Sequence, residues 1–183
     1  EQRAVYLQIT LPAAFIANHG HGNYTEQWAH EASIVPSDAW PLLAHRRAAY
    51  EPSSHNPLHK LRSRGRYLDA VLQQVQSDGA LTAADLPPVP GQKRKPGDWH
   101  RSIPRWALEY HFARGDLAVS HRLGNFQRVY DLPERLIPRH HLHAALDRET
   151  ADREMLRRDQ LQLDEIGLSG HFRRGLEDSK SDP

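Results

Sequence analysis

The stretch that decides the fold is residues 103–132, IPRWALEYHFARGDLAVSHRLGNFQRVYDL. It predicts, in order, a helix over 103–114, a break at Gly115 and Asp116, a strand over 117–121, a turn at 123–125 and a return strand over 126–130. A helix that runs into a small two-stranded wing is how a winged helix-turn-helix unit ends. Arg122 and Arg128 lie on this predicted wing, so the stretch points toward nucleic acid.

The residues before this stretch complete such a unit. Residues 65–77 form the clearest amphipathic helix, whose apolar side chains recur at intervals of three and four residues: Leu68, Val71, Leu72 and Val75. Gly79 ends this helix. Thr82 and Asp85 resemble a capping box that opens a short second helix, which Pro87 ends. One complete unit is therefore predicted over residues 65–131, and the fold class is mainly α with small β wings.

The flanking segments are also expected to be helical. Residues 25–32 are interpreted as a short helical or turn segment. Residues 37–50 are predicted to form one helix capped by Ser37. A charged helix is expected over residues 148–166, with its inward side chains listed last: Met155, Leu156 and Leu163.

Composition limits the class of protein. The chain has 183 residues, 13 prolines and a formal net charge of +1, so any basic surface must be local. It has no cysteine, which excludes disulfides, thiolate metal sites and cysteine nucleophiles. No apolar run approaches the roughly 20 residues of a membrane span, and no signal peptide is visible. We expect a cytoplasmic protein, associated with the nucleoid in use, that needs no cofactor and contacts no membrane; the sequence does not indicate its oligomeric state.

The strongest indication of binding is a basic loop that comes directly before the helix predicted over residues 103–114. An aromatic residue lies among its cations, a pattern typical of contact with a nucleic-acid backbone. The alternative is a solvated loop without a partner. The candidate DNA-binding residues here and on the wing are Lys93, Arg94, Lys95, Trp99, Arg101, Arg105, Arg122 and Arg128.

The helix at 103–114 argues against reading of base sequence. It is apolar on two sides, so we expect it to be buried on two sides, with mainly Arg105 and Glu109 meeting solvent. A recognition helix offers several polar side chains to base edges. We therefore expect this unit to act as a scaffold that binds the backbone of double-stranded DNA without strong sequence preference.

Three separated blocks carry a resemblance to a known family: residues 28–33 (WAHEAS) followed by Pro36, residues 105–110 (RWALEY) and residues 128–135 (RVYDLPER). Together they resemble the AlkZ/YcaQ-like winged-helix DNA glycosylases, which remove alkylated bases and unhook interstrand crosslinks. The family strings several winged-helix units together. The resemblance implies a remnant of a first unit over residues 1–64, a complete unit over 65–138, and the start of a third unit with a polar tail over 139–183.

The resemblance also implies where the chemistry lies. The family carries Gln-x-Gln or Gln-x-Asp in its first unit, and the nearest match here is Gln8-Ile9-Thr10. Gln8 matches and Thr10 departs from the pattern. A threonine hydroxyl can bond a water but is a poor proton acceptor, so we expect weakened or absent activity. The alternative for Gln8 is a polar residue on a half-buried strand.

Histidines supply weaker candidates. His30 and Glu31 could face DNA or orient the water, or could cap a structural turn in which Trp28 packs. The second histidine of a zinc-protease helix would fall at Ile34, so that motif fails. The histidines at 19–21 and 140–143 lack a recognisable ligand pattern, and solvated loops are the simpler interpretation. No metal site is expected.

Three hypotheses remain open. The leading one is a truncated or divergent glycosylase that binds duplex DNA and hydrolyses the N-glycosidic bond of alkylated bases weakly or not at all. The second is a non-enzymatic winged-helix DNA-binding or regulatory protein. The third is a decayed remnant, which would unfold with poor cooperativity.

Overall fold

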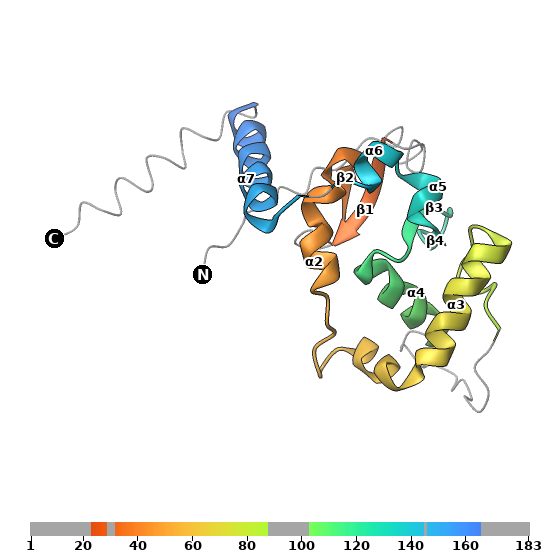
Figure 1. Ribbon diagram of the computed structural model, residues 1–183. Coiled ribbons are helices and arrows are strands. Elements are labelled where there is room, and N and C mark those ends of the chain that lie inside the picture. Colours follow the sequence, from red (N-terminus) through yellow and green to blue (C-terminus); the bar gives the residue numbers. More distant parts are fainter. Residues whose placement is uncertain (1–22, 29–31, 88–102, 145, 166–183) are drawn as a thin grey trace.

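The computed structural model describes residues 23–28, 32–87, 103–144 and 146–165. These residues form a mostly helical fold with two small antiparallel sheets, which confirms the predicted mainly α class with small β elements (Figure 1). The elements are β1 (Tyr24–Trp28), β2 (Ala32–Pro36), η1 (Ser37–Ala39), η2 (Pro41–Leu43), α2 (Ala44–Ala48), η3 (Pro57–Arg64), α3 (Gly65–Asp78), α4 (Ile103–Arg114), β3 (Ala118–Arg122), β4 (Arg128–Asp131), α5 (Pro133–Leu136), α6 (Arg139–Leu142) and α7 (Arg148–Glu165).

The main hydrophobic core lies where α3, α4 and the β3–β4 hairpin meet. α3 buries the face that its periodicity predicts, with Val75 fully inaccessible to solvent. α4 matches its predicted bounds and buries side chains on two sides, as expected for a central helix. The buried members of this core include Leu61, Leu68, Val71, Leu108, Phe112, Leu117 and Tyr130.

One short segment adds to the β3–β4 hairpin. Leu81 forms an antiparallel bridge with Tyr130: the Leu81 N–H donates to the Tyr130 carbonyl at 2.9 Å, and the Tyr130 N–H donates back at 2.8 Å. The segment between α3 and α4 is therefore tied to the far strand of the hairpin. This bond pair positions the hairpin against the core.

The predicted second helix is wrong within the described residues up to 87. Half of the expected capping box forms: the Thr82 N–H donates to Asp85 Oδ2 at 2.7 Å, but Thr82 Oγ1 also donates to that oxygen and accepts from the Ala84 N–H rather than from that of Asp85. These bonds close a single turn over residues 83–85 and no helix follows. Pro87 explains the stop, since a proline disfavours helical backbone at the residue before it.

The predicted helical segment at residues 25–32 is also wrong, because a hairpin occupies this region. β1 pairs with β2 in register from Tyr24 opposite Pro36 to Trp28 opposite Ala32. Thr25, Ile34 and Val35 are β-branched and favour the extended backbone. Pairing with a neighbouring strand overrides the short local pattern that suggested a helix.

The helix predicted over residues 37–50 is divided. Two turns of 3-10 helix, η1 and η2, come before the five-residue α2. Pro41 causes this division because it has no N–H to donate back to the Ser37 carbonyl. The Trp40 N–H bonds that carbonyl instead, at 3.1 Å, in the tighter 3-10 pattern.

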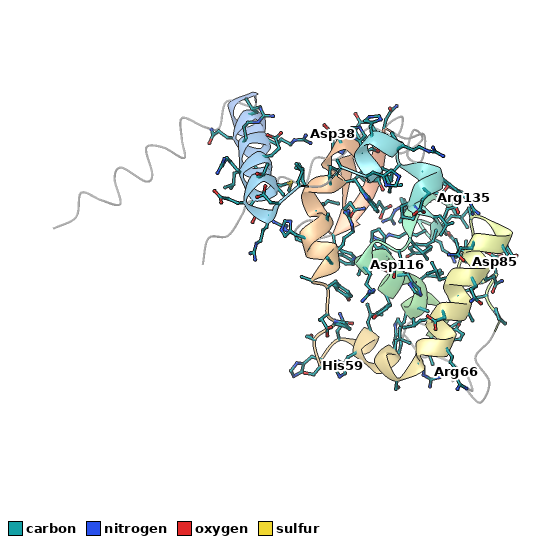
Figure 2. The ribbon with its side chains drawn as sticks, viewed as in Figure 1. Asp38, His59, Arg66, Asp85, Asp116 and Arg135 are labelled. Carbon is teal, nitrogen blue, oxygen red and sulfur yellow. The ribbon has the colours of Figure 1, made fainter. Side chains whose placement is uncertain are left out.

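α7 packs at one end of the molecule, beside α2 and the first hairpin (Figure 1). Ala151 and Met155 contact Ala39 and Leu42, and Arg158 pairs with Asp38, which Figure 2 labels, at 3.0 Å. Met155 faces inward as predicted. Leu156 does not: its side chain is 68% exposed, because the contact stripe runs through residues 151, 155 and 158. The side chain of Leu163 lies outside the described part.

Candidate nucleic-acid interface

The β3–β4 hairpin lies where the sequence predicts a wing. β3 begins and ends one residue later than predicted, and β4 begins two residues later and ends one residue later. Ala118 lies opposite Asp131 and Arg122 opposite Arg128, with an irregularity between Val119 and His121. The strands end on a tight loop over residues 123–127. Arg122 and Arg128 therefore face each other across the ladder, at the point where the loop begins.

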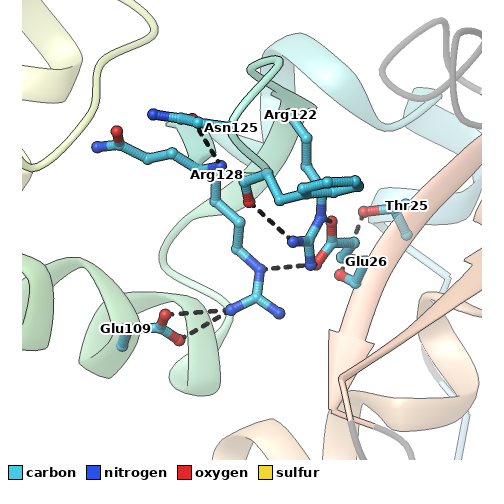
Figure 3. A network of polar contacts seen from close by, with 8 residues as sticks. Thr25, Glu26, Glu109, Arg122, Asn125 and Arg128 are labelled. Carbon is cyan, nitrogen blue, oxygen red and sulfur yellow. Dashed lines mark hydrogen bonds and ion pairs between the residues drawn. The ribbon is translucent and has the colours of Figure 1, made fainter.

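Both arginines meet a carboxylate that arrives from the first hairpin. Arg122 binds Glu26 with two parallel bonds, from Nε to Oε1 at 2.6 Å and from Nη2 to Oε2 at 2.8 Å (Figure 3). Arg128 Nε donates to Glu26 Oε2 at 2.6 Å. Glu26 is buried, with 1% of its surface exposed. Burial and paired geometry make this a strong charge-assisted contact.

A second carboxylate completes the group from the opposite side. Arg128 Nη1 donates to both oxygens of Glu109 on α4, at 3.1 Å each (Figure 3). We call Glu26, Glu109, Arg122 and Arg128 the wing network. Glu109 is 3% exposed, so the expectation that it meets solvent is wrong. It lies beneath the β3–β4 hairpin, where Arg128 supplies the opposite charge.

The charges of the wing network cancel, with two carboxylates against two guanidinium groups. Burial raises the pKa of Glu26, but the hydrogen bond from Arg122 and the charge of Arg128 outweigh burial, so this pKa is lowered overall. Burial lowers the pKa of Arg128, and the charges of Glu26 and Glu109 raise it by more. Glu26 and Arg128 are therefore each stabilised in the charged form. Because both carboxylates already accept guanidinium bonds, neither fits the role of a general base.

A buried histidine ties α4 to α3. His111 Nδ1 lies 2.9 Å from Asp116 Oδ2, and its Nε2 lies 3.0 Å from the Leu68 carbonyl oxygen; Figure 2 labels Asp116 beside α4. Both ring nitrogens therefore have an oxygen partner within the fold. This histidine stabilises the helix pair, and its ring has no free nitrogen for catalysis.

Arg47 is a partly buried cation that joins several elements. It donates to Gln27 Oε1 at 3.1 Å and lies over the ring of Trp40 at 3.9 Å. Burial lowers its pKa to about 10. Its side chain runs against Gly115, whose φ of 79° and lack of a Cβ leave room for it. These contacts connect α2 with the end of α4.

Most sequence-predicted site residues lie outside the described residues. The candidates in this position are Gln8, Thr10, His30, Glu31, Lys93, Arg94, Lys95, Trp99 and Arg101. Trp28 is described: its exposed ring lies 6.3 Å from Phe112, centroid to centroid. Arg105 is exposed on the first turn of α4.

The two wing arginines have limited freedom to bind DNA. The Arg128 side chain is 12% exposed and contacts two carboxylates, whereas Arg122 is 28% exposed. The side chain of Arg122 is the more exposed of the two. Their proposed role in phosphate contact therefore competes with the wing network.

Sequence reasoning missed three residues that shape this surface. Glu26 and Glu109 hold the wing, and Phe126 projects from its tip with 74% of its surface exposed. Phe126 also has a φ of 62°, in the left-handed region. The sequence places Phe126 at the start of the return strand, which is wrong: β4 begins at Arg128, so Phe126 lies in the loop.

Searches for other kinds of site give no candidate among the described residues. Within residues 23–28, 32–87, 103–144 and 146–165, no three histidine or acidic side chains are grouped to hold a metal ion. No helix in these ranges is long and apolar enough to cross a membrane.

Comparison with known proteins supplies the family. No solved structure matches the chain. The model of the family described as DNA glycosylase AlkZ-like matches residues 12–159, which contain all three blocks that carry the resemblance. Gln8 and Thr10 precede this match. The chain belongs to the DNA glycosylase AlkZ-like family, so its function is related to that of DNA glycosylases, with DNA as the substrate.

Proposed function

We propose that this protein binds double-stranded DNA through a winged-helix unit and hydrolyses the N-glycosidic bond of N-alkylated bases slowly. The match to the DNA glycosylase AlkZ-like family over residues 12–159 carries this proposal. The order α3, bridge at Leu81, α4 and β3–β4 hairpin supports the winged-helix interpretation.

The proposed reaction requires little acid–base catalysis by the protein. A base alkylated at N7 is already cationic and leaves without further protonation, through a transition state with positive charge on the sugar. The protein then has to position a water and stabilise that charge. We assign the water to the side chain of Gln8, with Thr10 as a weak second partner.

Release of N7-methylguanine from duplex DNA tests this chemistry. We expect slow release that falls to background in Gln8→Ala and rises in Thr10→Asp, because aspartate accepts a proton that threonine cannot. Gln73→Ala is the matched control, since it removes the same amide from an exposed position on α3. Release that is unchanged in Gln8→Ala would contradict the assignment of Gln8.

The proposed DNA contact uses the basic loop rather than base edges. The DNA association constant falls as salt rises, and each phosphate contact contributes about 0.9 to the steepness of log K against log salt. Replacing Lys93, Arg94 and Lys95 by glutamine should therefore make this slope shallower by about 3. The matched control replaces Arg148, Arg153 and Arg157 on α7, which removes the same charge elsewhere. An equal change in both variants would mean that only net charge matters.

A non-enzymatic DNA-binding protein is the second candidate. The sequence feature that favours it is Thr10: the resemblance implies an amide or a carboxylate at this position, and threonine departs from that pattern. A regulator should prefer one sequence over random DNA by about 10³-fold or more. Equal affinity for scrambled duplexes would exclude that role and leave the glycosylase-related one.

A further inference from the structure

The tip of the β3–β4 hairpin is a tight, well-bonded loop. The Phe126 N–H donates to the Leu123 carbonyl at 2.8 Å, and the Leu123 N–H donates to the Gln127 carbonyl at 2.9 Å. The Asn125 side chain accepts from the Gln127 N–H at 3.1 Å. These three bonds fix the backbone of the loop, so its side chains project in defined directions.

Phe126 occupies a backbone position that glycine would fill without strain. Its φ is 62°, and in a hairpin loop of this kind the left-handed position is usually taken by glycine or asparagine. A bulky side chain there costs conformational energy. Its ring is 74% exposed, so packing within the fold does not offset that cost. Strain without a folding benefit indicates a functional side chain.

The wing network fixes the backbone that carries this side chain. Arg122 Nη1 donates to the Phe126 carbonyl at 3.0 Å while the same guanidinium binds Glu26, which is buried in the first hairpin. The tip is therefore braced against an element far away in sequence. A rigid support is what a residue needs in order to insert into a partner without losing entropy.

The chemistry of the tip suits a base rather than a phosphate. Residues 123–127 are Leu, Gly, Asn, Phe and Gln, with no charged side chain, and Leu123 is also exposed. Residues 118–130 contain no acidic residue to repel the phosphate backbone. The wing arginines are engaged with carboxylates, so the largest group offered to a partner is an aromatic ring.

We propose that Phe126 stacks on a base of bound DNA, with the tip of the wing inserted where the duplex is distorted. Aromatic side chains stack on every type of base, and apolar wedges enter between unstacked steps. This inference rests on the proposed DNA binding of the chain. It gives the wing a contact that differs from the phosphate contacts of the basic loop.

The test uses the full chain and a 20-base-pair duplex that carries one abasic site, with an intact duplex beside it. We expect Phe126→Gly to weaken binding to the abasic duplex about tenfold, and Phe126→Trp to retain it. Leu156→Ala is the matched control, because it removes an exposed apolar side chain from α7. Its affinity should equal that of the wild type.

Thermal unfolding separates this role from a structural one. Glycine relieves the strain of the left-handed position, so the Tm of Phe126→Gly should rise by about 3 °C while its DNA affinity falls. A lower Tm would mean that the ring packs within the fold and would overturn the proposal.

The remaining outcomes are also decisive. Wild-type protein that binds neither duplex would overturn the proposed function together with this inference. Wild type and Phe126→Gly that bind the abasic duplex equally would overturn the inference alone. If equal DNA binding came with the loss of a wild-type dimer in Phe126→Gly, the tip would be assigned to a second copy of the chain.

Discussion

The wing network and the ion pairs of α7 use the same side chains at nearly the same distances. In the wing network, arginine–carboxylate distances run from 2.6 to 3.1 Å. The α7 pairs, defined as Arg148–Asp152, Glu149–Arg153, Glu154–Arg157 and Glu154–Arg158, run from 2.6 to 3.4 Å. Distance therefore does not distinguish the two regions.

Burial and separation along the chain do distinguish them. Glu26 lies 96 residues from Arg122 and 102 from Arg128, whereas the α7 partners are three or four residues apart. Both carboxylates of the wing network are buried, so the loss of one member leaves an opposite charge without a partner in a largely buried site. The α7 pairs lie at the surface, where water and salt replace a lost partner. The first should hold the fold, and the second should not.

The largest effect should follow loss of the central carboxylate. Glu26→Gln keeps the shape of the side chain and removes its charge, which leaves Arg122 and Arg128 with one carboxylate fewer in a buried site. We expect the free energy of unfolding to fall by about 3 to 5 kcal/mol. Urea unfolding followed by circular dichroism measures it. Glu149→Gln on α7 is the control, and a loss below about 1 kcal/mol in Glu26→Gln would place the two regions in the same class.

This contrast also explains what the sequence could and could not predict. α3, α4 and the wing follow from periodicity and from punctuation by Gly79 and Gly115, which are local signals. The short helical or turn segment predicted at residues 25–32 is wrong, because residues 24–28 form β1 and this strand is stabilised by pairing with β2. No local pattern carries that information.

The candidate site shows the same limit. Arg122 and Arg128 were predicted to bind DNA because they are cations on a wing. The sequence could not show that Glu26, about 100 residues away, forms ion pairs with both of them. The sequence predicts that Glu109 meets solvent, because charged residues are almost never fully buried unless they are paired. In the structure its carboxylate is buried because Arg128 pairs with it.

The next largest effect should come from the shape of the bridging cation. Arg128 reaches Glu26 with Nε and Glu109 with Nη1, so it spans two carboxylates on different elements. A single lysine ammonium cannot replace both contacts. We expect Arg128→Lys to lower the free energy of unfolding by about 2 kcal/mol. Arg157→Lys on α7 should have no measurable effect in the same urea titration, and equal losses in both variants would remove the distinction.

Acid should weaken the wing network by a smaller amount that grows gradually. The pKa of Glu26 is lowered in the folded protein from its ordinary value of 4.5, because the arginine contacts outweigh burial. A lowered folded pKa means that this stability is present above pH 4.5 and is lost as the pH falls through the folded value. The difference in unfolding free energy between wild type and Glu26→Gln should therefore shrink below pH 4.5. A difference that stays constant down to pH 3 would contradict the assignment.

The smallest effect should come from the best-connected carboxylate of α7. Glu154 accepts bonds from Arg157 and Arg158, and these bonds lower its pKa to about 2. Judged by its lowered pKa alone, Glu154 should contribute strongly to the free energy of unfolding. Its partners lie three and four residues away on one solvated helix, so the pair persists in partly unfolded chains and is screened by salt. Glu154→Gln should leave the urea midpoint unchanged within error in 0.5 M NaCl. A clear loss there would show that α7 depends on its charges, and that solvent exposure is the wrong criterion for separating the two regions.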